Sequence, residues 1–354
     1  MWLAVLLGAA PAPAAAQERP VRLTVAASGD LLIHTPVAQR ALALALGGGR
    51  SYNFAPLFAP VRRHIAGADL ALCHMETPLV PGPVQGYPSF RTPPDLARSA
   101  RQVGWDACST ASNHTLDQGQ AGVRSTLEAL DRAGVRHTGS FASRRARRRS
   151  LILRARGVRV AFLAYTATTN GLPLPHPWSV DLAEPRRVIR DARRARRRGA
   201  DVVVVNLHWG TEYRHAPDAH QRRLARRLAR SGAITAVVGQ HAHVVQPIRR
   251  VRGRWVVFGS GNLLSNQTAA CCTAATQDGM VVRLHLRVRG RRARVARITY
   301  APTWVRHPDF RVLPVGRALR SGAADRAALR ASWRRTVGVV GRRRGLRPEP
   351  ARLP

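Results

Sequence analysis

The chain has 354 residues, 45% of them hydrophobic and only 5% aromatic, and its 58 basic and 19 acidic residues leave a formal net charge of +39. This length suits one large domain or two ordinary ones, and the apolar fraction supports a buried core built mainly from Ala, Val and Leu. Beyond the N-terminal residues no segment is apolar for long enough to span a bilayer, which excludes a later membrane span.

The N-terminal residues form an apolar run that ends in Ala14, Ala15 and Ala16. Such a run before small residues is typical of a signal peptide and its cleavage site. The alternative is a buried N-terminal helix, which Pro11 and Pro13 disfavour. We therefore expect residues 1–16 to be a signal peptide and the protein to be secreted or to lie in the cell envelope, outside the cytoplasm.

Strands and helices are expected to alternate along the chain, which predicts an α/β architecture. Five apolar stretches have the character of buried strands: residues 23–27, 69–74, 106–110, 201–207 and 235–238. Helical stretches lie between them, for example residues 117–133 and 218–230.

The remaining elements are shorter. Residues 151–165 are expected to form a hairpin that turns at Gly157, and short strands are expected near residues 255–258, 280–286 and 294–298. We assign residues 21–315 to the main domain. Residues 316–354 are expected to form an Arg-rich helix and a Pro-containing tail, either docked on the domain or partly disordered.

The basic residues are all Arg, with two dense blocks at residues 144–149 and 193–198. A solvated basic surface explains this charge without a partner, whereas affinity for anionic envelope polymers is the functional alternative. Nucleic acid is the usual first partner for such a charge. The signal peptide and the lack of a DNA- or RNA-binding motif argue against a specific nucleic-acid partner, while a membrane surface facing the Arg-rich side stays open.

Each of the five predicted strands ends in a residue that can bind metal. Open α/β sheets place their sites at the carboxyl ends of strands, where side chains remote in sequence converge. The residues found there are Asp30, Glu76, Asn113, His208, His241 and His243, with His34 and His114 beside them. Taken singly, Asp30 could belong to a turn, Asn113 could cap a helix and His208 could be a buried core histidine. Five such residues in succession, each after a strand, favour a common site.

Carboxylate, carboxamide and imidazole ligands without thiolate suit Mn, Fe or Zn rather than Ca or a structural zinc. Two such ions ~3.5–4 Å apart can share a carboxylate and clamp the attacking and leaving oxygens of a displacement. We therefore expect two divalent transition metals, with Glu76 as the bridge. His241 and His243 would point the same way in an extended segment and could face two adjacent ions in a loop.

The four cysteines are Cys73, Cys108, Cys271 and Cys272, and none has the C-x-x-C spacing of a zinc site. A disulfide is expected in an oxidising compartment. A disulfide between the adjacent Cys271 and Cys272 would close a strained ring. A disulfide from either of them to Cys73 or Cys108 is therefore a competing possibility, and the connectivity stays open.

Six segments carry a resemblance to a known family. They are Gly29-Asp30, CHMETP at 73–78, SNHTLDQG at 112–119, HWGTEY at 208–213, GQHAHVVQP at 239–247 and FGSGN at 258–262. In this order they resemble the CapA family of poly-γ-glutamate capsule synthesis proteins, within the calcineurin-like metallophosphatases, over roughly residues 23 to 315. Three departures bear on the occupancy of one metal site: Asp-x-His is absent because His34 lies four residues after Asp30, Glu76 replaces the usual Asp, and Gln240 stands where His is frequent.

The resemblance implies a four-layer α/β/β/α sandwich of metallophosphatase type, with two mixed sheets flanked by helices and the site at one edge. It implies an exported hydrolase of capsule or poly-γ-glutamate-type polymer synthesis, whose metal-activated hydroxide attacks a phosphoester or amide-type bond. In that reading His114 protonates the leaving group or stabilises its charge, and the partners are an anionic polymer or phosphoester substrate and the capsule-synthesis machinery. A non-catalytic, metal-containing envelope component is the alternative. A polyanion-binding module with a vestigial site is the third, which the full ligand set disfavours.

Overall fold

The computed structural model describes residues 20–45, 51–322 and 324–352. The expected signal peptide, residues 1–16, lies outside these described residues. Within them, every helix is too short or too polar to cross a membrane.

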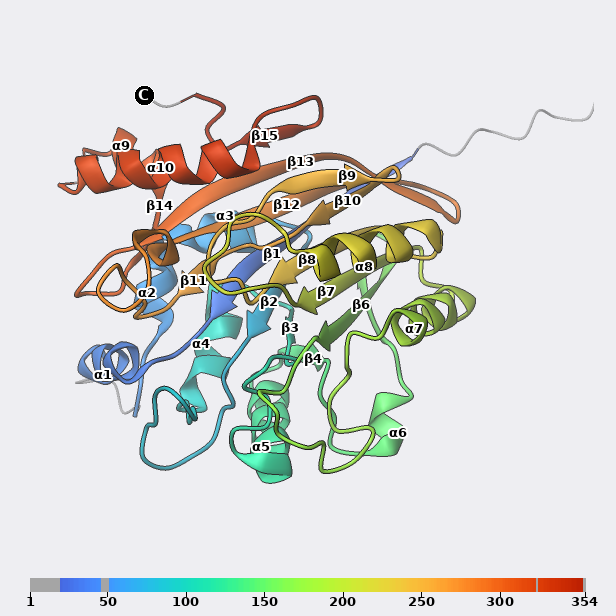
Figure 1. The fold of residues 1–354 in the computed structure, drawn as a ribbon, viewed down its shortest axis with the longest axis horizontal. Coiled ribbons are helices and arrows are strands. Elements are labelled where there is room, and N and C mark those ends of the chain that lie inside the picture. Colours follow the sequence, from blue (N-terminus) through green and yellow to red (C-terminus); the bar gives the residue numbers. More distant parts are fainter. Residues whose placement is uncertain (1–19, 46–50, 323, 353–354) are drawn as a thin grey trace, which may run out of the picture.

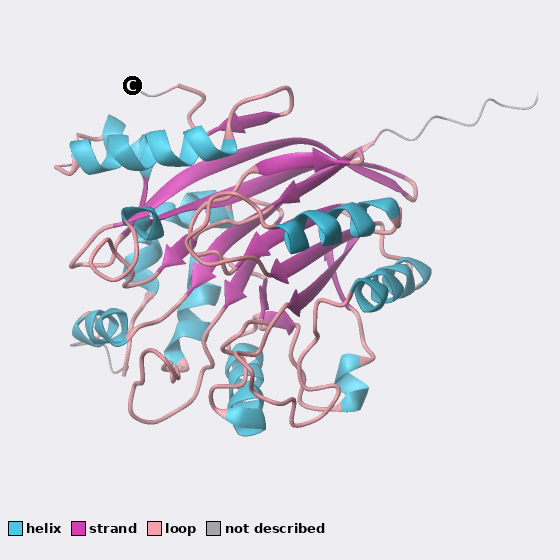
Figure 2. Cartoon of the chain, in the orientation of Figure 1, coloured by secondary structure: helices cyan, strands magenta, loops and turns pink. Residues whose placement is uncertain are grey.

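The larger of two β-sheets has nine strands within the described ranges and is mixed (Figure 2). Its main path runs β14-β13-β12-β1-β2-β3-β4, with β11 paired to β1 and β15 paired to β13. The strands from β1 to β4 are parallel, whereas β1 and β12 are antiparallel. The bounds are β1 (Val21–Leu31), β2 (Leu70–Met75), β3 (Ala107–Ser109), β4 (Arg136–Thr138), β11 (Asn262–Leu264), β12 (Asp278–Arg289), β13 (Arg292–Val305), β14 (Val312–Pro314) and β15 (Leu346–Pro348).

The second sheet is also mixed and has six strands in the described part of the chain, in the order β5-β6-β7-β8-β10-β9. Strands β6, β7, β8 and β10 are parallel, and antiparallel β5 and β9 close the two edges. Strands β5 and β6 form the hairpin expected over residues 151–165. The bounds are β5 (Leu151–Ala155), β6 (Val158–Thr166), β7 (Val202–His208), β8 (Ala236–Gln240), β9 (Ile248–Val251) and β10 (Arg254–Val257).

The two sheets pack face to face, with helices on both outer sides (Figure 1). Side chains such as Val25 and Leu72 of the first sheet meet Val204 and Val238 of the second. The predicted four-layer α/β/β/α arrangement is confirmed. The helices are α1 (Thr35–Ala43), α2 (Ala55–Phe58), α3 (Arg62–Ala66), α4 (Asp95–Val103), α5 (Gly119–Arg132), α6 (Arg144–Arg147), α7 (Pro185–Arg197) and α8 (Ala219–Arg230), with 3-10 turns η1 (Ala59–Val61) and η2 (Ala274–Gln277).

Buried strands and capped helices explain why the sequence forms these layers. The run Val202–Leu207 is almost continuously apolar because β7 is covered on both faces, as is usual for a parallel strand between layers. Helix α8 begins at a capping box, in which Asp218 Oδ1 accepts from the backbone N–H of Gln221 at 2.7 Å.

The described part of the C-terminal segment is docked on the larger sheet. Helices α9 (Val315–Arg320) and α10 (Arg326–Val340) lie beside β13, and Trp333 packs in a cluster with Trp304. Arg335 of α10 donates two hydrogen bonds to the buried Asp278 of β12, at 2.6 and 3.0 Å. This ion pair ties the segment to the sheet that carries part of the candidate site.

The four cysteines form two disulfides. Cys73 of β2 bonds Cys108 of the adjacent strand β3, where the two residues lie opposite each other. Cys271 bonds its neighbour Cys272 in the loop before η2. Of the two pairings left open by the sequence, the structure therefore has the disulfide between the adjacent Cys271 and Cys272, and neither of them pairs with Cys73 or Cys108.

Candidate metal centre

The carboxyl ends of β1, β2, β7 and β8 meet at one edge of the sandwich and bring the predicted ligands together. Asp30 of β1 lies opposite His74 of β2 and opposite Asn262 of β11. A Cβ atom at Gly29 would lie 2.0 Å from the carbonyl oxygen of Gly261, so only glycine permits this close approach. The Gly-Asp motif thus has a packing role besides supplying a carboxylate.

Glu76 lies at the centre of this cluster, directly after β2. It is 1% exposed, and neither carboxylate oxygen has a hydrogen-bond partner among the described residues. Its Oε1 atom lies 3.8 Å from His208 Nε2 and 3.6 Å from His243 Nε2. Burial raises the pKa of Glu76 well above its usual value, although the nearby His243 opposes that rise. A buried carboxylate without partners is costly, and a cation would satisfy it.

One group of donors surrounds Glu76 with residues that lie at or after the ends of strands of both sheets. Ligand atoms of Glu76, His208 and His241 lie within 4.8 Å of one another. Asn113 Oδ1 lies 2.8 Å from His208 Nε2, and Asn113 Nδ2 donates to Asn170 Oδ1 at 3.1 Å, which turns the oxygen of Asn113 towards the cluster. Glu76, Asn113, His208 and His241 together offer one metal site; we call them the inner set.

A second group shares Glu76 and combines it with Asp30 of β1 and with His243, which follows β8. Ligand atoms of Asp30, Glu76 and His243 also lie within 4.8 Å of one another, and we call these residues the outer set. Asp30 Oδ2 accepts a hydrogen bond from the backbone N–H of His241 at 3.2 Å, whereas Asp30 Oδ1 has no partner within the described residues. The carboxylate of Glu76 is thus common to both sets, as expected for a bridge.

The His-x-His pair lies in a loop rather than in an extended strand. His241 and His243 have φ angles of +87° and +54°, in the left-handed region that non-glycine residues avoid. Each such residue costs ~1–3 kcal/mol and persists where the surroundings hold it. Of the two arrangements left open by the sequence, the structure has the one that directs the two rings towards different sets.

Protonation of the histidines fits metal ligation. Burial lowers the pKa of His74 to about 4 and that of His241 to about 3, and it lowers the pKa of His208 well below its usual value. These rings are neutral near pH 7 and have lone pairs free for a cation. His243 differs, because the charges of Glu76 and Asp30 outweigh its burial and raise its pKa to about 10. Buried orphan carboxylate oxygens beside neutral imidazoles are the donor set that a divalent transition metal requires.

Metal binding is expected to release a proton. Below pH 10 His243 is protonated in the metal-free protein, and an ion bound to its ring must displace that proton. The apparent affinity should therefore rise by about tenfold per pH unit through the neutral range and level off near pH 10. Calorimetric titration at pH 7 in buffers of different ionisation enthalpy measures the protons released. Metal uptake with no proton release would contradict this assignment.

Comparison with known proteins places the chain in a family. Residues 24–267, more than half of the chain, match the family described as bacterial capsule synthesis protein PGA_cap. The chain belongs to this family. The CapA resemblance predicted from the six motifs is thereby confirmed.

Two relatives and two solved structures illustrate the relationship. Capsule biosynthesis protein CapA of Bacillus anthracis is 28% identical over 201 residues, 55% of this chain and 48% of that protein. PGA biosynthesis protein CapA of Bacillus subtilis is 28% identical over 209 residues, 57% and 52% of the two chains. This PGA_cap chain therefore spans about half the length of these relatives.

The solved structures are more distant. A phosphatase of Mycoplasma pneumoniae aligns with a TM-score of 0.49 and 12% identity, covering 80% of this chain and 94% of that chain. Calcineurin-like phosphoesterase YfkN of Bacillus subtilis aligns with a TM-score of 0.49 and 15% identity, covering 80% and 90%.

His114 borders the cluster and is oriented by an acid. Its Nδ1 atom lies 2.8 Å from Asp117 Oδ2, and that oxygen also accepts a hydrogen bond from the backbone N–H of Phe90 at 2.7 Å. The edge of the Phe90 ring packs against the imidazole, with ring centroids 4.7 Å apart. With Nδ1 committed to Asp117, Nε2 is the nitrogen of His114 that can act on a ligand.

His34 lies beside the cluster but its ring is held by the backbone. Its Nδ1 atom lies 3.2 Å from the carbonyl oxygen of Leu32 and 3.3 Å from the backbone nitrogen of Asn266. Within the described ranges it belongs to no group of residues whose donor atoms converge as a metal site. Its role as a ligand stays a prediction.

Three residues near the centre were not assigned from the sequence. His74 Nε2 lies 2.9 Å from His208 Nδ1, and His74 forms a further converging group with Asp30 and His208. Asn262 Oδ1 lies 3.0 Å from His243 Nδ1 and orients that ring. Glu212 Oε1 lies 4.0 Å from His243 Nε2. Each of the three lies in a segment that carries the family resemblance, namely CHMETP, HWGTEY and FGSGN, which was the usable signal.

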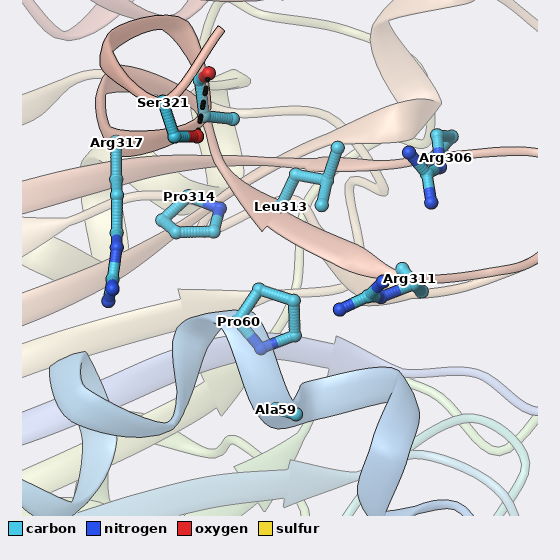
Figure 3. Close-up of a pocket in the computed structure, with 9 residues that line it drawn as sticks. Ala59, Pro60, Arg306, Arg311, Leu313, Pro314, Arg317 and Ser321 are labelled. Carbon is cyan, nitrogen blue, oxygen red and sulfur yellow. Dashed lines mark hydrogen bonds between the residues drawn. The ribbon is translucent and has the colours of Figure 1, made fainter. Parts of the chain in front are cut away.

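A wide surface cavity lies apart from this cluster. A cavity of about 370 Å³ opens between η1, β14 and α9, and Figure 3 shows arginine side chains around an apolar floor. Its lining includes Arg311, Arg317 and Pro60 but none of the residues of the inner and outer sets.

Proposed function

We propose that the chain is a metal-dependent, hydrolase-like protein of the cell envelope that acts in the synthesis of a capsule or poly-γ-glutamate-type polymer. The observation that carries this proposal is the Glu76 carboxylate, buried, without hydrogen-bond partners among the described residues and shared by two sets of metal-capable side chains. Membership of the PGA_cap family supports the polymer context. The bond attacked is a phosphoester or amide-type bond.

The residues present fit two divalent ions. The inner set would hold one ion through Glu76, Asn113, His208 and His241, and the outer set would hold the other through Asp30, Glu76 and His243. Such ions, when bound, polarise the scissile group and make a water nucleophilic near neutral pH.

The chain itself supplies orientation and proton handling. Asn262 and Asp30 fix the ring of His243, and Asn170 fixes the amide of Asn113. The His114–Asp117 pair can hold a proton on His114 Nε2 and deliver it to a leaving oxygen. Phe90 covers one side of this imidazole and limits its contact with water.

A non-catalytic metal site is the second candidate, and burial favours it. Asp30 and His208 are fully buried and Glu76 is 1% exposed. A site this enclosed can hold the edge of the sandwich together without turning over a substrate. In that case the chain supports polymer synthesis or export through its fold.

Hydrolysis assays separate the two candidates. Metal-loaded protein should cleave a generic phosphodiester or a γ-linked glutamate oligomer, lose this activity with a chelator and regain it with metal. Tight metal binding without turnover of either substrate class would favour the structural role.

Anionic polymer is the partner we propose for the arginine-rich face of α7. Arg186, Arg190, Arg193 and Arg197 are exposed and recur at helical spacing, and they line a cavity of about 410 Å³. A neighbouring cavity of about 340 Å³ continues this surface towards α6 past Trp178. A row of like charges along one helix attracts a flexible polyanion and is strongly salt-sensitive.

Polyanion binding is expected to depend on salt and on this row. Changing the four α7 arginines to Gln should weaken binding of polyglutamate more than the same four-charge change at Arg223, Arg226, Arg227 and Arg230, which are exposed on α8. Binding should also fade between 0.1 M and 1 M salt, as the screening length falls from ~10 Å to ~3 Å. Affinity measured across a salt series tests both points. Equal losses in the two variants would mean that net charge alone acts, and salt-independent binding would contradict the proposal.

A further inference from the structure

The outer set has one protein donor fewer than the inner set. The inner set offers four protein groups, whereas Asp30, Glu76 and His243 offer three. Catalytic zinc sites commonly have three protein ligands with water or substrate in the fourth position, whereas structural sites have four protein ligands, so a fourth protein donor would change the character of the outer site. Within the described residues His34 belongs to no group of converging donor atoms, so a fourth protein donor has to be sought elsewhere.

Glu212 lies where that donor is needed. Its Oε1 atom is 4.0 Å from His243 Nε2, and Glu76 Oε1 is 3.6 Å from the same nitrogen. Ligand atoms of Glu212, His241 and His243 all lie within 4.8 Å of one another. An ion at His243 Nε2 would therefore lie near two carboxylates, one buried and one reached from the solvent side, where 39% of the Glu212 side chain is exposed.

The loop that carries Glu212 is fixed to the loop of the two histidines. The backbone N–H of Tyr213 donates to the carbonyl oxygen of Ala242, between His241 and His243, at 2.8 Å. Gln246 Nε2 donates to the carbonyl oxygen of Arg214 at 2.8 Å. Tyr213 has a φ of +62°, so a strained residue is held next to Glu212. The proximity of Glu212 to the histidines is thus built into the fold of both loops.

Charge balance favours the same arrangement. Two divalent ions carry four positive charges, and the buried Asp30 and Glu76 supply two negative charges among the ligands of both sets. Buried ions need close compensation because water no longer solvates them. A third carboxylate on the solvent side lowers the excess of positive charge from two to one.

We propose that Glu212 is a metal ligand that completes the outer set with Asp30, Glu76 and His243. The proposal rests on the metal site described under the proposed function. Before metal binds, the half-exposed carboxylate is solvated; once an ion is present, it closes the site from outside.

Metal titration of the Glu212→Gln variant tests this assignment. Elemental analysis and calorimetric or competition titration with Co²⁺ or Zn²⁺ should give two ions in the unaltered chain. In the variant one ion should bind at least about 10–100-fold more weakly. A loss of this size is typical even when the residue removed only hydrogen-bonds to a metal ligand. Glu128→Gln on α5 is the matched control, since that side chain is 65% exposed and pairs only with Arg132 within the described part.

The outcomes are distinguishable. Glu212→Gln and His243→Ala should lower the affinity for the same ion. The double variant should lose no more binding free energy than the sum of the two single losses. Two ions bound with unaltered affinity in Glu212→Gln would overturn this inference and leave the proposed function standing. Loss of the ion held by His208 and His241 would also overturn it. An unaltered chain that binds no metal would overturn the proposed function itself.

Discussion

Glu76→Ala is expected to abolish the binding of both metal ions. The Glu76 carboxylate belongs to the inner and the outer set alike, so its removal leaves two cations with little negative charge between them. The affinity for each ion should fall by more than roughly 10–100-fold, which is the loss caused by removing a residue that only hydrogen-bonds to a metal ligand. Elemental analysis and titration with Zn²⁺ or Mn²⁺ measure this effect. Retention of either ion at wild-type affinity would refute the bridging role.

Single-set variants are the controls for Glu76. Asn113→Ala should weaken the ion of the inner set, and His243→Ala should weaken the ion of the outer set. A metal-free Glu76→Gln variant should keep the fold, because it removes a desolvated carboxylate together with a charge that keeps the buried His243 protonated, and the two effects oppose each other. Thermal unfolding of both metal-free proteins separates loss of a ligand from loss of the fold.

His114→Asn is expected to reduce turnover by ~10²–10⁴-fold, the usual contribution of a positioned acid. His114 lies beside the metal-capable groups and not within them, so metal content and melting temperature should be unchanged. Substrate affinity should change little. Steady-state kinetics on a phosphodiester, with metal content measured in parallel, gives both quantities.

Asp117→Asn is the companion variant for His114. An amide can still hold Nδ1 but stabilises the protonated ring less, so kcat should fall while KM is unchanged. A structural metal site predicts another pattern, in which His114→Asn affects neither hydrolysis nor polymer production. That result would end the enzymatic role of His114.

Much of the site was predictable because strand ends are recognisable in the sequence. The apolar run Val202–Leu207 ends in His208, and the run before Gln240 leads to His241 and His243. Parallel strands bring such ends to one edge, so residues far apart in the chain could be assigned to one cluster without coordinates.

What was missed depends on contacts that the sequence does not encode locally. His74 lies inside a strand, and its closeness to His208 arises only when the two sheets pack. Glu212 lies in a loop whose course is set by the hydrogen bond from Tyr213 to Ala242. His34 was included because of its position after Asp30; its Nδ1 faces the backbone of Leu32 and Asn266, and its role as a ligand stays a prediction.

The C-terminal segment illustrates the same limit. From its arginine content this segment could be docked on the domain or partly disordered. The buried Asp278, remote in the sequence, binds Arg335 and docks α10 on β12. Pairing with a distant acid, rather than composition, decides the place of this helix.

Elemental analysis of the unaltered chain, purified without chelator and reconstituted with Mn²⁺, Fe²⁺ or Zn²⁺, tests the central claim most directly. The buried carboxylates of Asp30 and Glu76 and the neutral rings of His208 and His241 predict two transition-metal ions per chain at saturation, with at least one retained through purification. A chain that carries no metal after purification and takes up none on reconstitution would contradict the account.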